Sequence, residues 1–428
     1  MRRFVHSLVI LALAPSLLWA QSATTVPAPR TINGFDASRL ARIDQALQRY
    51  VDSNEISGAV ALVLRDGRPV YEKAVGWADK EAGRRMTTDA IFRIASQTKA
   101  ITSTAVLILV EEGKIGLQDP VSRFIPQFAH TTVATRSDTG RVIVPAKREI
   151  TIHDLLTHTS GISYGVDSIV APLYAARTLG PAAGWGWYTA DKNEPICTTM
   201  ERLASLPFVS QPGEKWVYGY SIDVLGCVVE RASGMPLDQF IRTRITDPLG
   251  MKDTFFFIPS DKKQRLVTVY MNDSAGRLQR APAGAKGQGH YVEGPRRNFA
   301  GGAGLLSTAR DYGRFLQMVA NGGQLGGVRI LAPRTVRLMT TNQVDTLLKA
   351  GNACMGFGLT FGVHDRFGCD DLSSEGTYFW GGAYGSSYMV DPQEHLIIVY
   401  MENRLPRHPD VGDNFRTLVY QALVEPRT

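Results

Sequence analysis

Apolar residues near the N-terminus recur first at helical and then at strand spacing. Within residues 36–54 they form one helical face, made of Leu40, Ile43, Leu47, Tyr50 and Val51. This spacing predicts an amphipathic helix. Residues 58–79 then hold two β-rich runs on either side of Asp66-Gly67. An Asp-Gly pair between two such runs predicts a β-hairpin.

The C-terminus repeats the same elements in reverse order. Residues 385–403 contain two β-rich runs around Asp391-Pro392, and residues 411–425 have the period of an amphipathic helix. We expect both chain ends to share one antiparallel sheet with helices on its faces, an architecture of the α/β (α+β) class. Residues 36–90 and 345–428 would form this sheet domain. Residues 91–344 would form a large, mostly helical insertion domain with long loops.

The first twenty residues have the composition of a secretory signal peptide. Arg2 and Arg3 precede an apolar run that ends at the small residue Ala20. A membrane anchor is the alternative, but the run is short for a bilayer span and Pro15 interrupts it. We therefore expect cleavage after residue 20, a flexible arm over residues 21–35, no membrane span in the mature chain, and a periplasmic or secreted location.

Composition narrows the class of protein further. The chain has 428 residues, 44% of them hydrophobic, which is enough for a large buried core. A net charge of +7 without a basic run interleaved with aromatic residues gives no indication of nucleic-acid binding. The four cysteines have no metal-site spacing, and we expect neither metal nor organic cofactor. Cys354 and Cys369 flank an expected hairpin and are the favoured disulfide pair over Cys197 and Cys227, with free thiols as the alternative.

Two serines compete for the role of nucleophile. Ser163 lies in the G-x-S-x-G string of residues 161–165, which is the pattern of a nucleophile elbow. An elbow requires a buried strand before the serine and a helix after it. The preceding residues instead have helical spacing capped by Thr151, and Gly161 fits the position just after a helix. We interpret Ser163 as a turn residue.

Ser96 has the context that a nucleophile needs. It precedes an apolar helical run that ends at Gly113, and Lys99 follows it by one helical turn on the same face. A serine hydroxyl needs a base, and a lysine can serve when burial disfavours its ammonium form. The amides at the helix N-terminus can also stabilise an oxyanion. A second S-x-x-K string, Ser260 to Lys263, lies in a charged segment and is expected at the surface.

Two distant segments carry groups that complete such a site. Tyr218 precedes an apolar helix and could relay the serine proton to the leaving group. Trp380-Gly381-Gly382 is expected at the start of a C-terminal strand, where glycines allow close approach of a substrate. The N–H group of Ala383 would be the second oxyanion donor beside that of Ser96. The long loop of residues 165–197 is expected to contribute aromatic walls to the substrate cleft, including Trp185 and Trp187.

Together these segments resemble the serine β-lactamase/penicillin-binding-protein superfamily, and within it the class C-related (family VIII) carboxylesterases. The resemblance spans residues 36–425 and implies a β-lactamase-like fold. It implies that Ser96 is acylated, that Lys99 is its partner and that Tyr218 is the tyrosine of the Y-x-N element. Trp380-Gly381-Gly382 matches the K-T-G element. Members of the esterase branch also carry a G-x-S-x-G that is not catalytic.

Two departures from the superfamily pattern bear on the substrate. Tyr220 replaces the asparagine of Y-x-N, and Trp380 replaces the lysine of K-T-G, which supplies positive charge for a substrate carboxylate. Both changes favour a small, neutral or apolar ester. The alternatives are a β-lactam or a D-amino-acid peptide cleaved at the same site, and a non-catalytic relative that binds peptidoglycan. The sequence leaves the natural substrate and the oligomeric state open.

Overall fold

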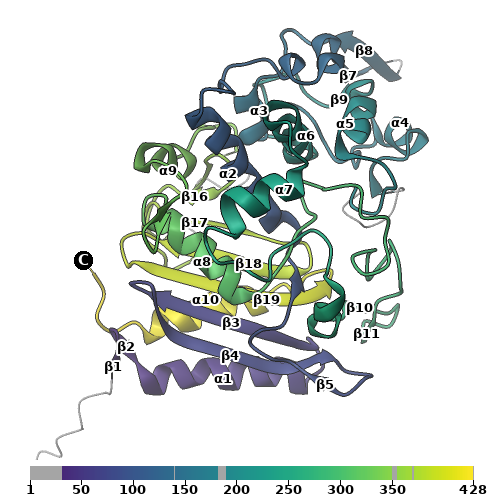
Figure 1. The fold of residues 1–428 in the computed structure, drawn as a ribbon. Helices are drawn as coiled ribbons and strands as arrows, with labels where there is room; N and C mark the ends of the chain where they lie inside the picture. The colour runs from purple at the N-terminus through teal and green to yellow at the C-terminus, as the bar shows by residue number, and fades with distance from the viewer. Residues whose placement is uncertain (1–30, 139, 182–188, 349–353, 369–370, 428) are drawn as a thin grey trace, which may run out of the picture.

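Strands from both ends of the chain meet in one ten-stranded sheet (Figure 1). The structure is a computed structural model that describes residues 31–138, 140–181, 189–348, 354–368 and 371–427. Along the sheet the order is β15 (Met355–Phe357), β16 (Gly362–His364), β17 (Tyr378–Gly381), β18 (Gly385–Asp391), β19 (Leu396–Leu405), β3 (Gly58–Arg65), β4 (Arg68–Asp79) and β5 (Arg84–Arg85). The expected sheet built from both chain ends is confirmed.

Both predicted hairpins form at the predicted turns. Arg65 pairs with Arg68 across Asp66 and Gly67, and both turn residues have positive φ, 54° and 72°. That geometry is the type I′ turn for which Asp-Gly is suited. At the other hairpin, the Asp391 carboxylate accepts the backbone N–H groups of Gln393 and Glu394, at 3.1 and 3.2 Å.

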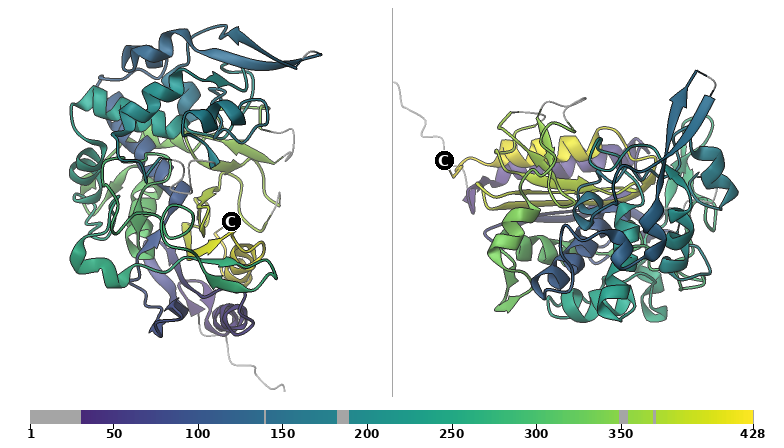
Figure 2. Two further views of the ribbon diagram at one scale, coloured as in Figure 1. Left: turned by 90° about the vertical axis from the view of Figure 1, so that its right-hand side faces the viewer. Right: turned by 90° about the horizontal axis from the view of Figure 1, so that it is seen from above.

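Helices cover both faces of the sheet, which explains why its central strands are almost continuously apolar. On β3, Ala59, Ala61 and Val63 pack with α1 (Ala37–Asp52) and α10 (Val411–Ala422). The alternate residues Val60 and Leu62 belong to the larger core on the opposite face, which includes α2 (Thr98–Glu111) and α8 (Ala309–Ala320). The right-hand view of Figure 2 shows these layers on the two sides of the sheet.

The region between the two sheet-forming ends is not only helical. Its other helices are α3 (Ile152–Leu156), α4 (Ala171–Ala176), α5 (Ile196–Ala204), α6 (Ser221–Ser233), α7 (Leu237–Ile241) and α9 (Pro333–Met339). It also holds a three-stranded sheet of β7 (Thr132–Ser137), β8 (Gly140–Pro145) and β9 (Pro207–Phe208). The β7–β8 hairpin projects from the body of the protein (Figure 2). The boundaries at 90 and 345 stay a prediction.

Part of this region joins the main sheet, which the sequence did not indicate. Within the region expected to be mostly helical, β10 (Tyr270–Asn272) and β11 (Leu278–Arg280) form a hairpin. β10 pairs in parallel with β19 through Tyr270 and Arg404. Shorter two-residue strands complete the fold: β1 (Thr31–Ile32) with β2 (Phe35–Asp36), β6 (Phe92–Arg93) with β12 (Leu306–Ser307), and β13 (Gln324–Leu325) with β14 (Val328–Arg329).

The predicted N-terminal arm ends earlier than expected. Residues 31–36 form β1 and β2, and Phe35 is fully buried among residues of α1 and α10. Burial of this large aromatic side chain fixes the segment to the sheet domain. The predicted signal peptide and residues 21–30 lie outside the described residues. No helix of the described part of the chain is long and apolar enough to cross a membrane.

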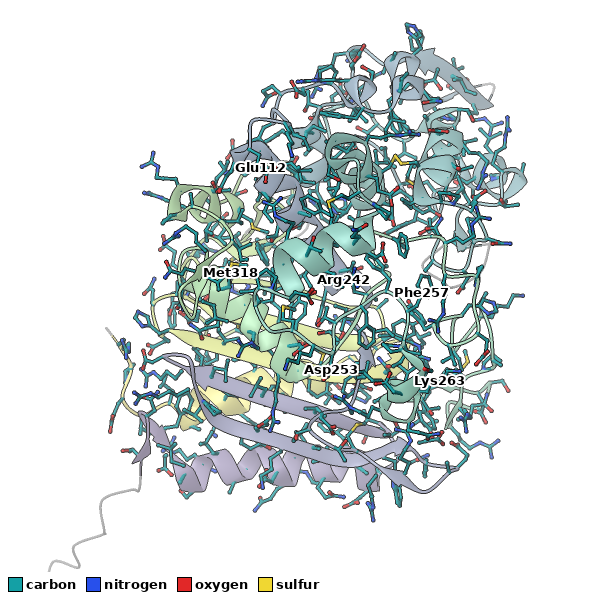
Figure 3. The ribbon with its side chains drawn as sticks, viewed as in Figure 1. Glu112, Arg242, Asp253, Phe257, Lys263 and Met318 are labelled. Carbon is teal, nitrogen blue, oxygen red and sulfur yellow. A yellow bond between two sulfur atoms is a disulfide. The ribbon has the colours of Figure 1, made fainter. Side chains whose placement is uncertain are left out.

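The structure contains a disulfide that the sequence did not indicate. Cys197 in α5 and Cys227 in α6 form a disulfide and cross-link the two helices; sulfur is drawn yellow in Figure 3. Cys354 is also disulfide-bonded, whereas Cys369 lies outside the described residues. The free-thiol alternative is therefore wrong for these three cysteines. Spacing along the chain could not reveal the first pair, because it depends on how α5 packs against α6.

Candidate active site

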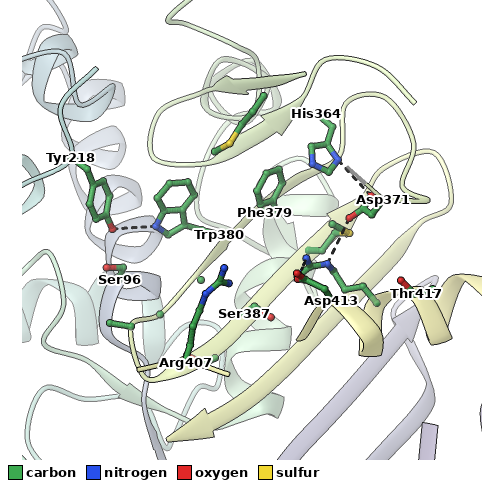
Figure 4. A pocket seen from close by; sticks show the side chains of 17 residues that line it. Ser96, Tyr218, His364, Asp371, Phe379, Trp380, Ser387, Arg407, Asp413 and Thr417 are labelled. Carbon is green, nitrogen blue, oxygen red and sulfur yellow. Dashed lines mark hydrogen bonds and ion pairs between the residues drawn. The ribbon is translucent and has the colours of Figure 1, made fainter. Parts of the chain in front are cut away.

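Ser96 lies at the bend between strand β6 and helix α2. Ala95 before it has a φ of +42°, an uncommon conformation for a residue with a side chain. A short 3₁₀ turn over Ala95–Gln97 then leads directly into α2. This bend leaves Ser96 half-exposed at the N-terminal end of a buried helix. Its side chain lines a cavity of about 660 Å³, shown in Figure 4.

Lys99 is completely buried beneath Ser96 and has three polar neighbours. Its Nζ atom lies 3.2 Å from Ser96 Oγ, 2.9 Å from the Tyr164 hydroxyl and 2.8 Å from the carbonyl oxygen of Gly302. The carbonyl can only accept a hydrogen bond. A neutral lysine amine has two N–H groups and one lone pair, so it satisfies all three contacts only if one hydroxyl donates to it. Donation from Ser96 would be the start of nucleophile activation.

Tyr218 is held on the cavity wall by an aromatic cluster. Its ring stacks on Trp216 with centroids 5.7 Å apart and lies 4.7 Å from the ring of His158. Lys99 Nζ is 4.6 Å from the same ring centroid. The indole N–H of Trp380 donates to the Tyr218 hydroxyl at 3.2 Å, the contact dashed in Figure 4, where the hydroxyl is directed toward Ser96. Tyr218 therefore faces the cavity, as its predicted role requires.

The turn after β17 brings a backbone amide to the other side of Ser96. Trp380 and Gly381 are the last residues of β17, not the start of the following strand as the sequence suggested. A side chain at Gly382 would meet the carbonyl oxygen of Ile94 at 2.4 Å. Glycine is thus needed here for backbone packing against the segment before Ser96, rather than for approach of a substrate. Ala383 follows on the cavity wall, and the described backbone hydrogen bonds use neither its N–H group nor that of Ser96.

The G-x-S-x-G segment supports the site without supplying its nucleophile. Ser163 is buried, and its Oγ accepts the N–H group of Gly165 at 3.0 Å. A side chain at Gly219 would meet the carbonyl oxygen of Ile162 at 2.2 Å, so this turn is the surface on which the Tyr218 segment packs. Helix α3 ends before the turn and is followed by His158 with a φ of +57°. Gly161 is therefore not the residue that ends the helix.

Sequence reasoning missed three residues around Lys99. Tyr164, from the turn of the G-x-S-x-G segment, has a hydroxyl that can accept a hydrogen bond from Lys99. Gly302 supplies a carbonyl acceptor, and its N–H group donates to Asp223 Oδ1 at 3.0 Å. Burial raises the pKa of Asp223 to about 6, against the lowering effect of the Lys99 charge. The signal available for Asp223 was a carboxylate inside the apolar run of α6, since unpaired acids are rarely buried.

His158 lies close to Lys99 and Tyr218 but is not a candidate base. His158 is fully buried, and this burial together with the nearby Lys99 charge lowers its pKa well below the ordinary value. Neither of its ring nitrogens has a hydrogen-bond partner in the part of the chain that the structure describes. A neutral imidazole without polar contacts serves here as an aromatic packing element under Tyr218.

The remaining predicted substrate contacts divide into three cases. Trp380, Gly381 and Gly382 line the cavity. Tyr220 does not: it is fully buried, its hydroxyl accepts the N–H group of Gly180 at 2.8 Å, and its ring packs edge-on against Tyr164. Tyr220 lies two residues after Tyr218, and after Gly219 the chain directs its side chain inward. Trp185 and Trp187 lie outside the described residues.

The second S-x-x-K string lies far from this cavity, as expected. Lys263 is at the periphery of the molecule in Figure 3 and pairs with Glu293 at 2.9 Å. Among the described residues, no group of three or more His, Cys, Asp or Glu side chains is placed to hold a metal ion.

Comparison with known proteins gives the family. Residues 43–422 match the protein family described as Beta-lactamase. Protein Rv1367c of Mycobacterium tuberculosis is 37% identical over 381 residues, covering 84% of this chain and 89% of that protein. Esterase EstB of Burkholderia gladioli is 34% identical over 381 residues, covering 86% and 91%. The solved structure of EstCE1, a hydrolase with promiscuous acyltransferase activity, matches with a TM-score of 0.76 at 26% identity, covering 90% of this chain and 99% of that one. The chain belongs to the β-lactamase family of serine hydrolases.

Proposed function

We propose that this protein hydrolyses small carboxylic esters through an acyl-enzyme on Ser96. The observation that carries the proposal is the buried amine of Lys99, 3.2 Å from Ser96 Oγ at the base of an open cavity. The similarity to esterase EstB supports an ester as the substrate.

In acylation, Ser96 Oγ attacks the ester carbonyl carbon and its proton passes to Lys99. The N–H groups of Ser96 and Ala383 stabilise the oxyanion that forms, because both are free to donate into the cavity. The intermediate then collapses, the carbon–oxygen bond to the alcohol breaks, and the Tyr218 hydroxyl protonates the leaving alkoxide. Lys99, which received the Ser96 proton, lies against the Tyr218 ring and returns that proton to the Tyr218 oxygen.

Deacylation reverses these proton movements. Water attacks the acyl carbonyl, and the same pair of groups, Tyr218 and Lys99, accepts its proton. The bond to Ser96 Oγ breaks, the serine recovers its hydrogen, and the carboxylic acid leaves. Atoms and charges balance without a cofactor. The indole N–H group of Trp380 stabilises Tyr218 whenever its oxygen carries negative charge.

The walls of the cavity favour an ester over an amide. Tyr220, which stands at the position of the Y-x-N asparagine, is buried and supplies no carboxamide to orient an amide. The apolar side chains of Met355, Phe379 and Met389 also line the cavity. Alcohols also leave a tetrahedral intermediate with less protonation than amines, so a site with weak leaving-group orientation suits esters.

Active-site substitutions distinguish the two candidate serines. With 4-nitrophenyl butyrate as substrate, Ser96→Ala should abolish turnover. Ser163→Ala should retain most of it, at a loss of about 1 kcal/mol of stability for its one hydrogen bond. Mass spectrometry after reaction with a fluorophosphonate probe should locate the label on Ser96. A folded but inactive Ser163→Ala protein, or a label on Ser163, would contradict the assignment.

The same preparation tests the substrate class. Nitrocefin, a chromogenic cephalosporin, should be turned over far more slowly than the ester, relative to each uncatalysed rate. Faster nitrocefin turnover would favour the β-lactam alternative, and absence of both labelling and turnover would favour a non-catalytic relative. We also propose that the chain is exported, which the disulfide between Cys197 and Cys227 supports. A mature N-terminus near residue 21 in the periplasmic or extracellular fraction would be the expected result, and an intact N-terminus on a cytoplasmic protein the opposing one.

A further inference from the structure

The cavity that contains Ser96 extends along β17 and β18 and has a charged far end. There Arg416 lies 3.6 Å from Asp371 and also pairs with Asp413. His364 faces the same Asp371 at 3.8 Å. Figure 4 shows this group on the side of the cavity remote from Ser96, next to α10. The charges of Arg416 are therefore matched by carboxylates within the protein.

Arg407 is the other cationic residue of this cavity, and it has a different environment. Its side chain is exposed and lines the cavity together with Ser96. In Figure 4 its guanidinium extends over the cavity floor between Ser96 and Ser387, below Trp380. Within the part of the chain that the structure describes, no carboxylate or backbone oxygen pairs with it. The lining acids Asp371 and Asp413 are already engaged by Arg416.

The backbone that carries Arg407 is anchored on both sides. The buried Arg404 donates to the carbonyl oxygen of Pro406 at 2.5 Å and to Asn272 Oδ1 at 3.0 Å. On the other side, His408 contacts Glu55 at 2.9 Å and packs edge-on against the Tyr50 ring. A cationic side chain on such a fixed turn loses less conformational entropy on binding a ligand than one on a loose loop.

We propose that Arg407 binds a carboxylate of the ester substrate, so that the site prefers esters that carry a negative charge near the reacting carbonyl. A guanidinium presents two parallel N–H groups to a carboxylate, which makes it the suited partner for this group. The sequence suggested a neutral ester because Trp380 replaces the lysine of K-T-G. The structure supplies a positive charge to the same cavity from the turn after β19. This inference rests on the proposed esterase function.

Matched pairs of esters test the preference. For a carboxylate on the acyl group, mono-4-nitrophenyl glutarate is compared with 4-nitrophenyl 5-methylhexanoate, in which two methyl groups replace the carboxylate oxygens. For a carboxylate on the alcohol, 4-butyryloxybenzoic acid is compared with its methyl ester. Initial rates give kcat/KM for each, with the rate of Ser96→Ala subtracted to remove uncatalysed hydrolysis. Arg407→Ala, Arg407→Lys and Arg407→Glu are measured beside a control, Arg334→Ala, which removes an exposed positive charge from α9 outside the cavity.

In at least one pair, Arg407→Ala should lower kcat/KM for the anionic ester about tenfold, the lower end for a hydrogen bond to a charged group, because the site is open to solvent. The neutral partner should change by no more than about twofold, which is within the effect of a surface substitution. Arg407→Lys should recover part of the loss, and Arg407→Glu should reverse the preference. Raised salt should weaken the preference of the parent protein, since exposed charges are screened.

Each other outcome counts against the inference. If Arg407→Ala lowers kcat/KM equally for neutral and anionic esters, the residue acts on folding or on the cavity shape and not on a carboxylate. If Arg334→Ala has the same effect as Arg407→Ala, the preference comes from overall charge. If the neutral esters are hydrolysed and no anionic ester is preferred, the carboxylate site is wrong while the esterase function stands. If no ester is hydrolysed, both fall together.

Discussion

The hydrogen bond from Trp380 to Tyr218 offers the sharpest test of how this site works. Replacing Trp380 by Phe keeps an aromatic ring on the wall, where the indole packs against Phe357 with centroids 5.3 Å apart. It removes the indole N–H group that lies 3.2 Å from the Tyr218 hydroxyl. If Tyr218 gives its proton to the leaving alkoxide, this N–H group stabilises the phenolate that results.

The size of the effect follows from the contact. A hydrogen bond to a charged group contributes about 1.5–3 kcal/mol, and an N···O distance longer than the usual 2.9 Å places this one at the lower end. About 1.5 kcal/mol corresponds to a fall in kcat/KM of about tenfold.

The assay is kcat/KM for 4-nitrophenyl butyrate between about pH 5 and 9, the range over which a perturbed base would titrate. Trp216→Phe is the matched control, because Trp216 stacks on the same tyrosine while its own indole nitrogen has no hydrogen-bond partner among the described residues. Its kcat/KM should stay within about threefold of the parent value, as for a loss of packing area alone. A Trp380→Phe protein with the parent rate and pH profile, or equal losses in both variants, would refute the role given to the N–H group.

Three further tests concern the surroundings of Lys99 and the stability of the fold. Tyr164→Phe removes one polar neighbour of the lysine and should lower kcat/KM by about three- to tenfold, whereas Tyr220→Phe, whose hydroxyl accepts the N–H group of Gly180, should not; equal effects would argue against the Tyr164 role. The pKa of Asp223, about 6 in the folded protein against 3.8 unfolded, means that its stabilising contribution is complete below pH 4 and is lost as pH rises through 6. The difference in unfolding free energy between Asp223→Asn and the parent, measured by urea denaturation, should therefore shift in favour of the variant by up to about 3 kcal/mol from pH 4 to pH 7. A difference that stays constant with pH would contradict the burial argument. Replacing Cys197 and Cys227 together by Ala should lower stability by about 3–4 kcal/mol, as expected for a cross-link that closes a loop of 30 residues, while leaving ester turnover intact; an unchanged urea midpoint would contradict it.

Sequence alone identified the features that depend on short distances along the chain. Asp66-Gly67 predicted its hairpin because two residues with positive φ join the strands. Ser96 and Lys99 were brought together correctly because residues three apart share one helix face, whatever the rest of the fold does. The apolar strands at both chain ends likewise predicted a sheet covered on both faces. In each case covalent spacing and backbone geometry leave few alternatives.

Tertiary structure decided which distant groups meet at the site. Tyr164 lies 65 residues from Lys99 and Gly302 lies 203 residues from it, yet both contact its amine. Tyr218 faces the cavity and Tyr220 does not, because Gly219 packs on the turn around Ile162. Periodicity carries no information about such contacts, since they depend on how whole elements pack.

The same reason explains the errors. Spacing drew attention to Cys354 and Cys369 but could not reveal the pair of Cys197 and Cys227, which the packing of α5 on α6 joins. The sequence also treated the loss of the K-T-G lysine as a loss of positive charge, but the turn after β19 brings Arg407 to the cavity. The sequence thus determined the nucleophile, its lysine and the sheet by local geometry. Only the packed fold determined the distant contacts of Lys99 and the positive charge of Arg407 in the cavity, because these depend on residues that are far apart until the chain folds.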